Sequence, residues 1–467
     1  MKGIRASFLA ALLVACGRPS PSPPIPASPS MPARPVASTA PSAPLEPAPV
    51  ASAPIDAGPA QLDPDGDDDP VADTGTGELP AVAHFERVGR SPLALRHICD
   101  LTPFKDTLYA AHAYQPLGLD GATIVAYRPD DDPKKRFTTA FDWNRIGEKQ
   151  QGGGAGQGFL RVHDFGGRLF VTDADPPYNG LGLVEHGTEG YVFISDREGR
   201  FAPARPPNHR PPGPPDAEDK PGAGVLPRAY HVLDVIRFRG RYYASTGSVP
   251  PKQHAWSGPS PGALHVASAD LTRWTYEIDY PFPWKDGVWR LTYLVRFKDR
   301  LYAGIQDYDG VEPNDYVYFD PPADAKVIDR EHEHPAKVTP LGTAQTLRWY
   351  ADGGKLYWIA SARDGVALRV TEDGDHWKAI DLPAGLGAPT DITRFRGALV
   401  VMMERGLVKL DGTVIARVTD KKSPFALVDL YCGAPIAVYR NELYVGGQRD
   451  GALFKLVEGE APDAGAK

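Results

Sequence analysis

Acidic side chains recur beside aromatic ones at matching places in this sequence, and they are the residues best suited to bind a polar ligand. Aspartate begins the related patterns "DLTPF", "DVIRF" and "DITRF", and arginine or tyrosine takes the same place in two further copies. Further acids follow the second half of several copies, as in "DADPPYNG" and "QDYDGVEPND". Carboxylates accept hydrogen bonds from sugar hydroxyls or bind a cation, while flat rings cover the apolar faces of sugars. The candidate ligand-binding residues are therefore Asp100, Arg161, Asp173, Asp175, Asp234, Tyr293, Asp307, Asp309 and Asp391.

The same residues allow two other interpretations. Polar residues of this kind also fill solvated loops without binding anything. Alternatively, two carboxylates held about 5 to 10 Å apart in a pocket would suit a glycan-active hydrolase or lyase. The sequence has no nucleophile elbow, Walker loop or His-x-x-x-His zinc motif, so no catalytic residue and no metal site is predicted. No cofactor is expected either, although the short run "DYDG" leaves calcium as an alternative.

The first residues resemble the export signal of a bacterial lipoprotein. Lys2 and Arg5 precede an apolar run too short to span a bilayer, and "LVAC" ends at Cys16. This order resembles the lipobox, in which a peptidase cuts before the cysteine and the thiol then carries the lipid. The resemblance implies a signal peptide over 1–15 and a lipidated Cys16, whose acyl chains, such as palmitate, hold the protein on a membrane. An ordinary cleaved signal with an incidental cysteine is the alternative.

The segment 16–82 is rich in proline, alanine and serine and is predicted to be a disordered tether, because it cannot bury enough apolar surface to fold. The formal charge of −8 argues against a nucleic-acid partner. The predicted location is the cell envelope, facing the periplasm or the cell surface, and the predicted state is a monomer.

Seven copies of one hairpin pattern account for most of the remaining chain. Each copy alternates apolar and polar residues on both sides of a short turn, and the fifth copy shows a longer turn at 352–354. This hairpin pattern recurs along the chain without helical segments between its copies, which predicts an all-β fold. We expect a seven-bladed β-propeller of four-stranded blades over 83–460, with a disordered tail over 461–467. The aromatic residues at the ends of the first strands are Phe104, Phe165, Phe238, Phe297, Tyr350, Phe395 and Tyr439.

The two ends of the repeat array are predicted to meet. The last copy has only three strands, and the strand-like segment 83–89 precedes the first hairpin, so we expect this segment to pair with the last blade. Cys99 and Cys432 lie near the starts of the first and seventh hairpins, which are neighbours in a closed ring. An exported protein meets oxidising conditions, so a Cys99–Cys432 disulfide is predicted. Two separately buried thiols are the alternative.

Two turns resemble the Asp-box of sialidase-like propellers. The runs "SADLTRW" and "TEDGDHW" place Asp270 and Asp373 at the aspartate position and Trp274 and Trp377 at the aromatic one, although the spaced glycine and threonine of the motif are missing. In that family the box is structural, so the resemblance supports the fold and implies no catalysis. The arginine motif of sialidases is absent before the first hairpin.

The sequence thus predicts a non-enzymatic, lipid-anchored propeller that binds an envelope protein or glycan. The alternative is the glycan-active hydrolase or lyase, which would use acids among Asp173, Asp175, Asp234, Asp307 and Asp391 at the mouth of the central channel.

Overall fold

The computed structural model describes residues 73–93, 95–113, 122–143, 158–174, 189–203, 213–215, 220–250, 259–308, 310, 312–340, 342–428 and 431–460. The predicted signal peptide, Cys16, most of the predicted tether and the predicted tail lie outside these residues. Within the described ranges, no helix is long and apolar enough to cross a membrane.

All seven predicted hairpins form as antiparallel strand pairs. Each is closed by a two-residue turn, as at Lys298 and Asp299, whose φ angles of 49° and 60° are those of a type I′ turn. The predicted longer turn of the fifth copy is wrong, because Asp352 pairs with Lys355 and leaves only two glycines between them. The pairs are β2 (His97–Phe104) with β3 (Thr107–Ala113), β6 (Phe159–Phe165) with β7 (Arg168–Asp173), β10 (Ala229–Phe238) with β11 (Arg241–Ser248), β14 (Trp289–Phe297) with β15 (Arg300–Asp307), β18 (Gln345–Asp352) with β19 (Lys355–Ala362), β22 (Pro389–Phe395) with β23 (Ala398–Met403), and β26 (Ile436–Tyr439) with β27 (Glu442–Gly446).

Five of the hairpins each gain a third and a fourth strand and form separate four-stranded blades. Successive strands of a blade are neighbours in the sheet, so each blade is a simple meander from the inner to the outer strand. The added strands are β4 (Thr123–Tyr127), β5 (Phe137–Asp142), β8 (Glu189–Ile194), β9 (Gly222–Pro227), β12 (Gly262–Ala267), β13 (Trp274–Tyr280), β16 (Tyr316–Phe319), β17 (Glu333–Ala336), β20 (Gly365–Thr371) and β21 (Lys378–Ala379).

The last two hairpins share one eight-stranded sheet in the order β22-β23-β24-β25-β1-β28-β27-β26. The prediction that 83–89 pairs with the last repeat is confirmed, since β1 (Ala83–Arg90) runs antiparallel to β28 (Ala452–Glu458). The same strand also pairs in parallel with β25 (Val414–Arg417), which follows β24 (Gly406–Lys409). The prediction of seven separate four-stranded blades is therefore wrong: five blades are separate, and β1 joins the remaining two hairpins because it pairs on both of its sides.

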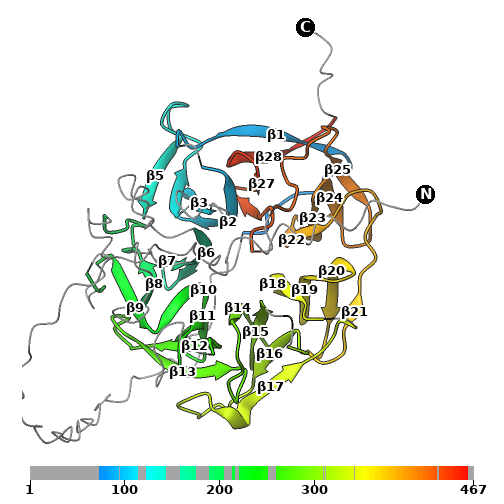
Figure 1. The fold of residues 1–467 in the computed structure, drawn as a ribbon. Coiled ribbons are helices and arrows are strands. Elements are labelled where there is room, and N and C mark those ends of the chain that lie inside the picture. The colour runs from blue at the N-terminus through cyan, green and yellow to red at the C-terminus, as the bar shows by residue number, and fades with distance from the viewer. Residues whose placement is uncertain are drawn as a thin grey trace, which may run out of the picture. The chain divides into compact units, whose positions relative to one another are not determined.

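The inner strands close a ring, which makes the fold a propeller (Figure 1). Strands β2, β6, β10, β14, β18, β22 and β26 each contact the next, and β26 contacts β2. The predicted disulfide between Cys99 and Cys432 is confirmed at this seam, with their Cα atoms 4.7 Å apart. Gln448 Nε2 also donates to the carbonyl of Ile98 across the seam, at 2.7 Å.

The described residues before β1 contact the turns of the sixth and seventh hairpins. Arg396 donates its backbone N–H to the carbonyl of Thr74 at 2.6 Å and its side chain to the carbonyl of Glu78 at 3.1 Å. Thr74 and Glu78, which were predicted to belong to the disordered tether, thus contact the folded body.

Candidate binding site at the centre of the ring

Six of the seven inner strands carry a charged residue or a tyrosine four positions before the last residue of the strand, and we call this set the central ring. In these strands the pairing register shifts at or next to this position, so a β-bulge locally changes the direction of the side chain. The central ring consists of Asp100, Arg161, Asp234, Tyr293, Arg348 and Asp391.

Arg348 is the member that the sequence analysis missed. The repeats were aligned on their aromatic residues, and in the fifth repeat Tyr350 lies two positions further from the turn than its counterparts. Alignment on the Gly353–Gly354 turn would have found Arg348.

Arg348 links the first and sixth repeats. Its Nε lies 2.8 Å from Oδ1 of Asp391 and its Nη2 lies 2.9 Å from Oδ2, a two-pronged ion pair. Both of its Nη atoms lie 3.3 Å from Oδ1 of Asp100. Burial lowers the pKa of Arg348, but the two carboxylates outweigh it and the net direction is upward. The guanidinium is therefore firmly charged between two acids.

Arg161 reaches across the ring. Its guanidinium lies 3.7 Å from the centroid of the Tyr293 ring, and its Nη2 donates to the carbonyl of Leu347 at 3.0 Å. Its Nη1 is 3.9 Å from Oδ1 of Asp100. The structure thus brings four of the predicted residues together through the two arginines: Asp100, Arg161, Tyr293 and Asp391.

The three aspartates of the central ring share one structural task. Each carboxylate accepts a backbone N–H from the inner strand of the following repeat. Asp100 accepts from Val162 at 3.0 Å, Asp234 from Leu294 at 2.8 Å, and Asp391 from Ile436 at 2.8 Å. These bonds hold consecutive repeats together, and they engage Asp234 and Asp391, two of the five acids that the alternative hydrolase could use.

Asp234 has an additional partner in His163, whose Nε2 lies 2.7 Å from Oδ1 of Asp234. Burial lowers the pKa of His163, but the charge of Asp234 and the hydrogen bond to it raise the pKa by more. The net direction is upward, so His163 holds its proton to a higher pH in the folded protein than a free histidine does.

The central ring lies inside the strands and not at their starts. Strand β10, for example, begins at Ala229, five residues before Asp234, and the side chains of Asp100, Asp234 and Asp391 are buried. A ligand-binding role for these residues stays a prediction.

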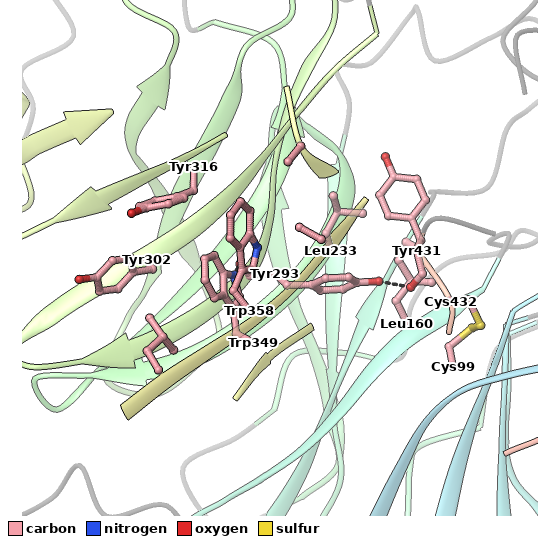
Figure 2. Packing of buried hydrophobic residues seen from close by; sticks show 14 of the residues in the cluster. Cys99, Leu160, Leu233, Tyr293, Tyr302, Tyr316, Trp349, Trp358, Tyr431 and Cys432 are labelled. Atoms are coloured by element: carbon pink, nitrogen blue, oxygen red, sulfur yellow. Dashed lines mark hydrogen bonds between the residues drawn. A yellow bond between two sulfur atoms is a disulfide. The ribbon is translucent and has the colours of Figure 1, made fainter. Parts of the chain in front are cut away.

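Apolar side chains and the disulfide fill the space next to the central ring. Leu160, Leu233 and Tyr293 come from three inner strands and pack in one buried cluster with Tyr431 and the cystine (Figure 2). The hydroxyl of Tyr293 donates to the carbonyl of Tyr431. The centre of the propeller is thus packed with side chains at this level.

A second group of polar side chains lies at the ends of the strands where the inner strands begin, and we call it the mouth cluster. Arg290, near the start of β14, donates to Oε1 of Gln306 at 3.2 Å and to the hydroxyl of Tyr431 at 2.8 Å. It also bonds Nε2 of His231, near the start of β10. The mouth cluster consists of His231, Arg290, Gln306, Tyr308, Gln345 and Tyr431.

The remaining predicted site residues lie near this end or outside the described residues. Asp173 ends β7 opposite Phe159, the first residue of β6, and is fully buried. Asp307 ends β15, and its Oδ2 accepts the backbone N–H of Glu312 at 2.6 Å. Asp175 and Asp309 lie outside the described residues.

Two observations bear on metals and on the Asp-box resemblance. Among the described residues, no group of three or more His, Cys, Asp or Glu side chains could hold a metal ion.

The two turns that resemble an Asp-box are held by their own aspartates. Asp270 and Asp373 accept hydrogen bonds within these turns, Asp270 from Thr272 at 3.1 Å and Asp373 from His376 at 2.8 Å. These carboxylates hold the turns before the outer strands.

Comparison with known proteins gives no family. No protein-family model and no curated protein matches this chain. Solved structures match weakly. The AfRom2 CNH domain is 8% identical with a TM-score of 0.42, and the match covers 81% of this chain and 100% of that one. BamB from Moraxella catarrhalis is 12% identical with a TM-score of 0.36 (81% of this chain, 99% of that one), and an α-L-arabinanase from Penicillium chrysogenum complexed with arabinobiose is 10% identical with a TM-score of 0.37 (82% of this chain, 99% of that one). Similarities this low carry no argument about function, and the class of this protein, a β-propeller, rests on its own strands.

Proposed function

We propose that this chain is a non-enzymatic binding scaffold of the cell envelope, held on a membrane by lipid on Cys16, with its ligand site at the mouth cluster. The mouth cluster carries the proposal, because side chains from several repeats converge there around a buried guanidinium and tyrosine rings. Ligand sites are commonly built in this way, from a few convergent polar groups beside aromatic surface.

The hydrogen bonds that the aspartate carboxylates accept support a scaffold in preference to a hydrolase. A hydrolase needs two carboxylates free to transfer protons or to attack the substrate. Among the acids considered for a hydrolase, Asp234 and Asp391 instead accept backbone N–H groups of neighbouring repeats, and Asp391 also pairs with Arg348. Asp307 accepts the backbone N–H of Glu312. Protonation of Asp234 or Asp391 would weaken the hydrogen bonds that link consecutive repeats.

The anchor is tested by replacing Cys16 with alanine in the full chain. The variant should move from the membrane fraction to the soluble fraction, and mass spectrometry should find the acyl chains only on the parent protein. Retention of the variant in the membrane fraction at high salt would contradict the anchor.

The scaffold role is tested by incubating the purified Cys16→Ala protein with envelope glycans and envelope proteins. We expect binding that leaves the ligand chemically unchanged by mass spectrometry. Appearance of shortened or unsaturated glycan products would contradict a non-enzymatic role.

A further inference from the structure

We propose that the inner strands bind a small oxyanion, a phosphate or carboxylate group, beside Arg348 and His163 at the end where the hairpins turn. We call this place the turn-side site. It goes beyond the proposed function, because the mouth cluster lies at the opposite ends of the same strands.

Solvent reaches the inner strands near their turns. Two positions before the last residue of the strand, five of the seven side chains are partly exposed, namely Thr102, His163, Val295, Tyr350 and Thr393. Five positions before it, all seven residues are at most 4% exposed, namely Cys99, Leu160, Leu233, Thr292, Leu347, Thr390 and Ala434. This buried level contains the cystine and its apolar neighbours (Figure 2). The central ring is therefore accessible from the side of the turns.

The most accessible charged groups at this level are cations. The side chain of His163 is 29% exposed and that of Arg348 is 16% exposed. The side chains of Asp234, Asp391 and Asp100 are only 3%, 4% and 10% exposed, and each accepts a backbone N–H group, as described above. An anion that approaches from the turns thus meets the guanidinium and the imidazole before the carboxylates.

Arg348 and His163 each keep a donor for a ligand. Nη1 of Arg348 carries two hydrogens, and within the described ranges its one partner is Oδ1 of Asp100. Nε2 of His163 is bound to Asp234, and Nδ1 has no partner within those ranges. Burial lowers the pKa of His163, but Asp234 and Asp100 raise it by more than burial and the nearby Arg161 lower it. The imidazolium form, which offers Nδ1–H to an anion, therefore persists to a higher pH than in a free histidine.

Basic residues surround this end of the inner strands. Among the two residues of each hairpin turn and the two on either side, twelve are basic and five are acidic, although the whole chain carries a formal charge of −8. In five hairpins the first turn residue is basic, and its charged group lies 4.9 to 5.8 Å from the centroid of the preceding aromatic ring. These residues are Lys105, Arg239, Lys298, Arg396 and Arg440. Lys105 is paired with Glu198 at 3.1 Å, but Lys298 and Arg396 form no ion pair within the part of the chain that the structure describes. Their field attracts an anion to the turn-side site.

Acids further from the axis limit the size of the ligand. The turns between third and fourth strands lie on the same face, and the turn before β21 carries Glu372, Asp373 and Asp375. An anionic membrane or a polyanion spread over this face would meet these carboxylates and be repelled. A small anion beside Arg348 would not, so the charges favour a small oxyanion.

The test is calorimetric titration of the full-length Cys16→Ala protein with inorganic phosphate and with succinate, at about pH 6 and at an ionic strength balanced with chloride. We expect saturable binding of phosphate, of succinate or of both. His163→Gln should weaken the binding about tenfold, because it removes a charge-assisted hydrogen bond. Lys298→Gln should weaken it about threefold, because an exposed charge contributes less. Lys378→Gln is the matched control, since it removes the same charge from the exposed strand β21 and should leave the affinity unchanged.

Binding of one probe alone would identify the ligand group as a phosphate or as a carboxylate, and either result supports the site. Three outcomes would overturn the inference: no saturable binding of either probe, unchanged affinity in both His163→Gln and Lys298→Gln, or an equal loss in Lys378→Gln. Lys298 is an exposed turn residue, so its replacement tests the site independently of the fold of His163→Gln.

Discussion

Replacing Asp391 with asparagine tests whether the central ring holds the propeller together. The Asp391 carboxylate is buried and accepts the backbone N–H groups of Ile392 and Ile436, each at 2.8 Å, in addition to the two bonds from Arg348. Asparagine keeps one acceptor oxygen and loses the charge, which leaves Arg348 with Asp100, at 3.3 Å, as its described carboxylate partner. Removal of one partner of a buried ion pair costs about 3 to 5 kcal/mol, so we expect the free energy of unfolding to fall by about that amount.

The measurement is urea unfolding followed by tryptophan fluorescence, with the midpoint shift converted through the slope of the parent protein. Asp364→Asn, at an exposed turn position, is the control and should change the free energy by no more than about 0.5 kcal/mol. Arg348→Met should also destabilise, and the double variant Arg348→Met/Asp391→Asn should lose less than the sum of the two single losses, because each change removes the same ion pair. A loss below about 1 kcal/mol in Asp391→Asn, or strictly additive losses, would refute the reasoning.

Three further results follow from the same contacts. Replacing Cys99 and Cys432 with alanine opens a loop spanning 333 positions, and the free energy of unfolding should fall by about 2 to 5 kcal/mol; a variant as stable as the oxidised parent would show that the disulfide adds nothing. The pKa of His163 is raised in the folded state, so its bond with Asp234 should stabilise the protein fully below about pH 6.5 and less as the pH rises through the folded pKa. The difference in the free energy of unfolding between the parent and His163→Gln should therefore shrink from pH 5 to pH 9. A difference that does not change with pH would contradict this. Deletion of 73–90 should expose the edges of β25 and β28 and cause association in size-exclusion chromatography, whereas a stable monomer would show that β1 is not needed for closure.

The hairpins could be predicted from the sequence because they depend on local chemistry, and the closing strand and the disulfide because they follow from the order of the repeats. A two-residue turn between alternating apolar and polar residues specifies a hairpin wherever it occurs. In a closed ring the first and last repeats are neighbours. The pairing of 83–89 with the last repeat therefore follows from chain order, and the pairing of Cys99 with Cys432 follows from chain order and oxidising conditions.

The tertiary structure alone decided the strand sharing at the seam and the bonding partners of the central-ring residues. Strand β1 pairs on both sides, with β25 and β28, and no pattern within its own residues indicates a second partner. The role of Asp391 and its counterparts depends on bulges that locally change the direction of their side chains, and the place of Arg348 depends on a register that differs by two residues from the aromatic alignment. Local sequence specifies which strands form, but the partner of a buried charge is set by the register between strands that are far apart in the chain, because only that register determines which groups can neutralise it.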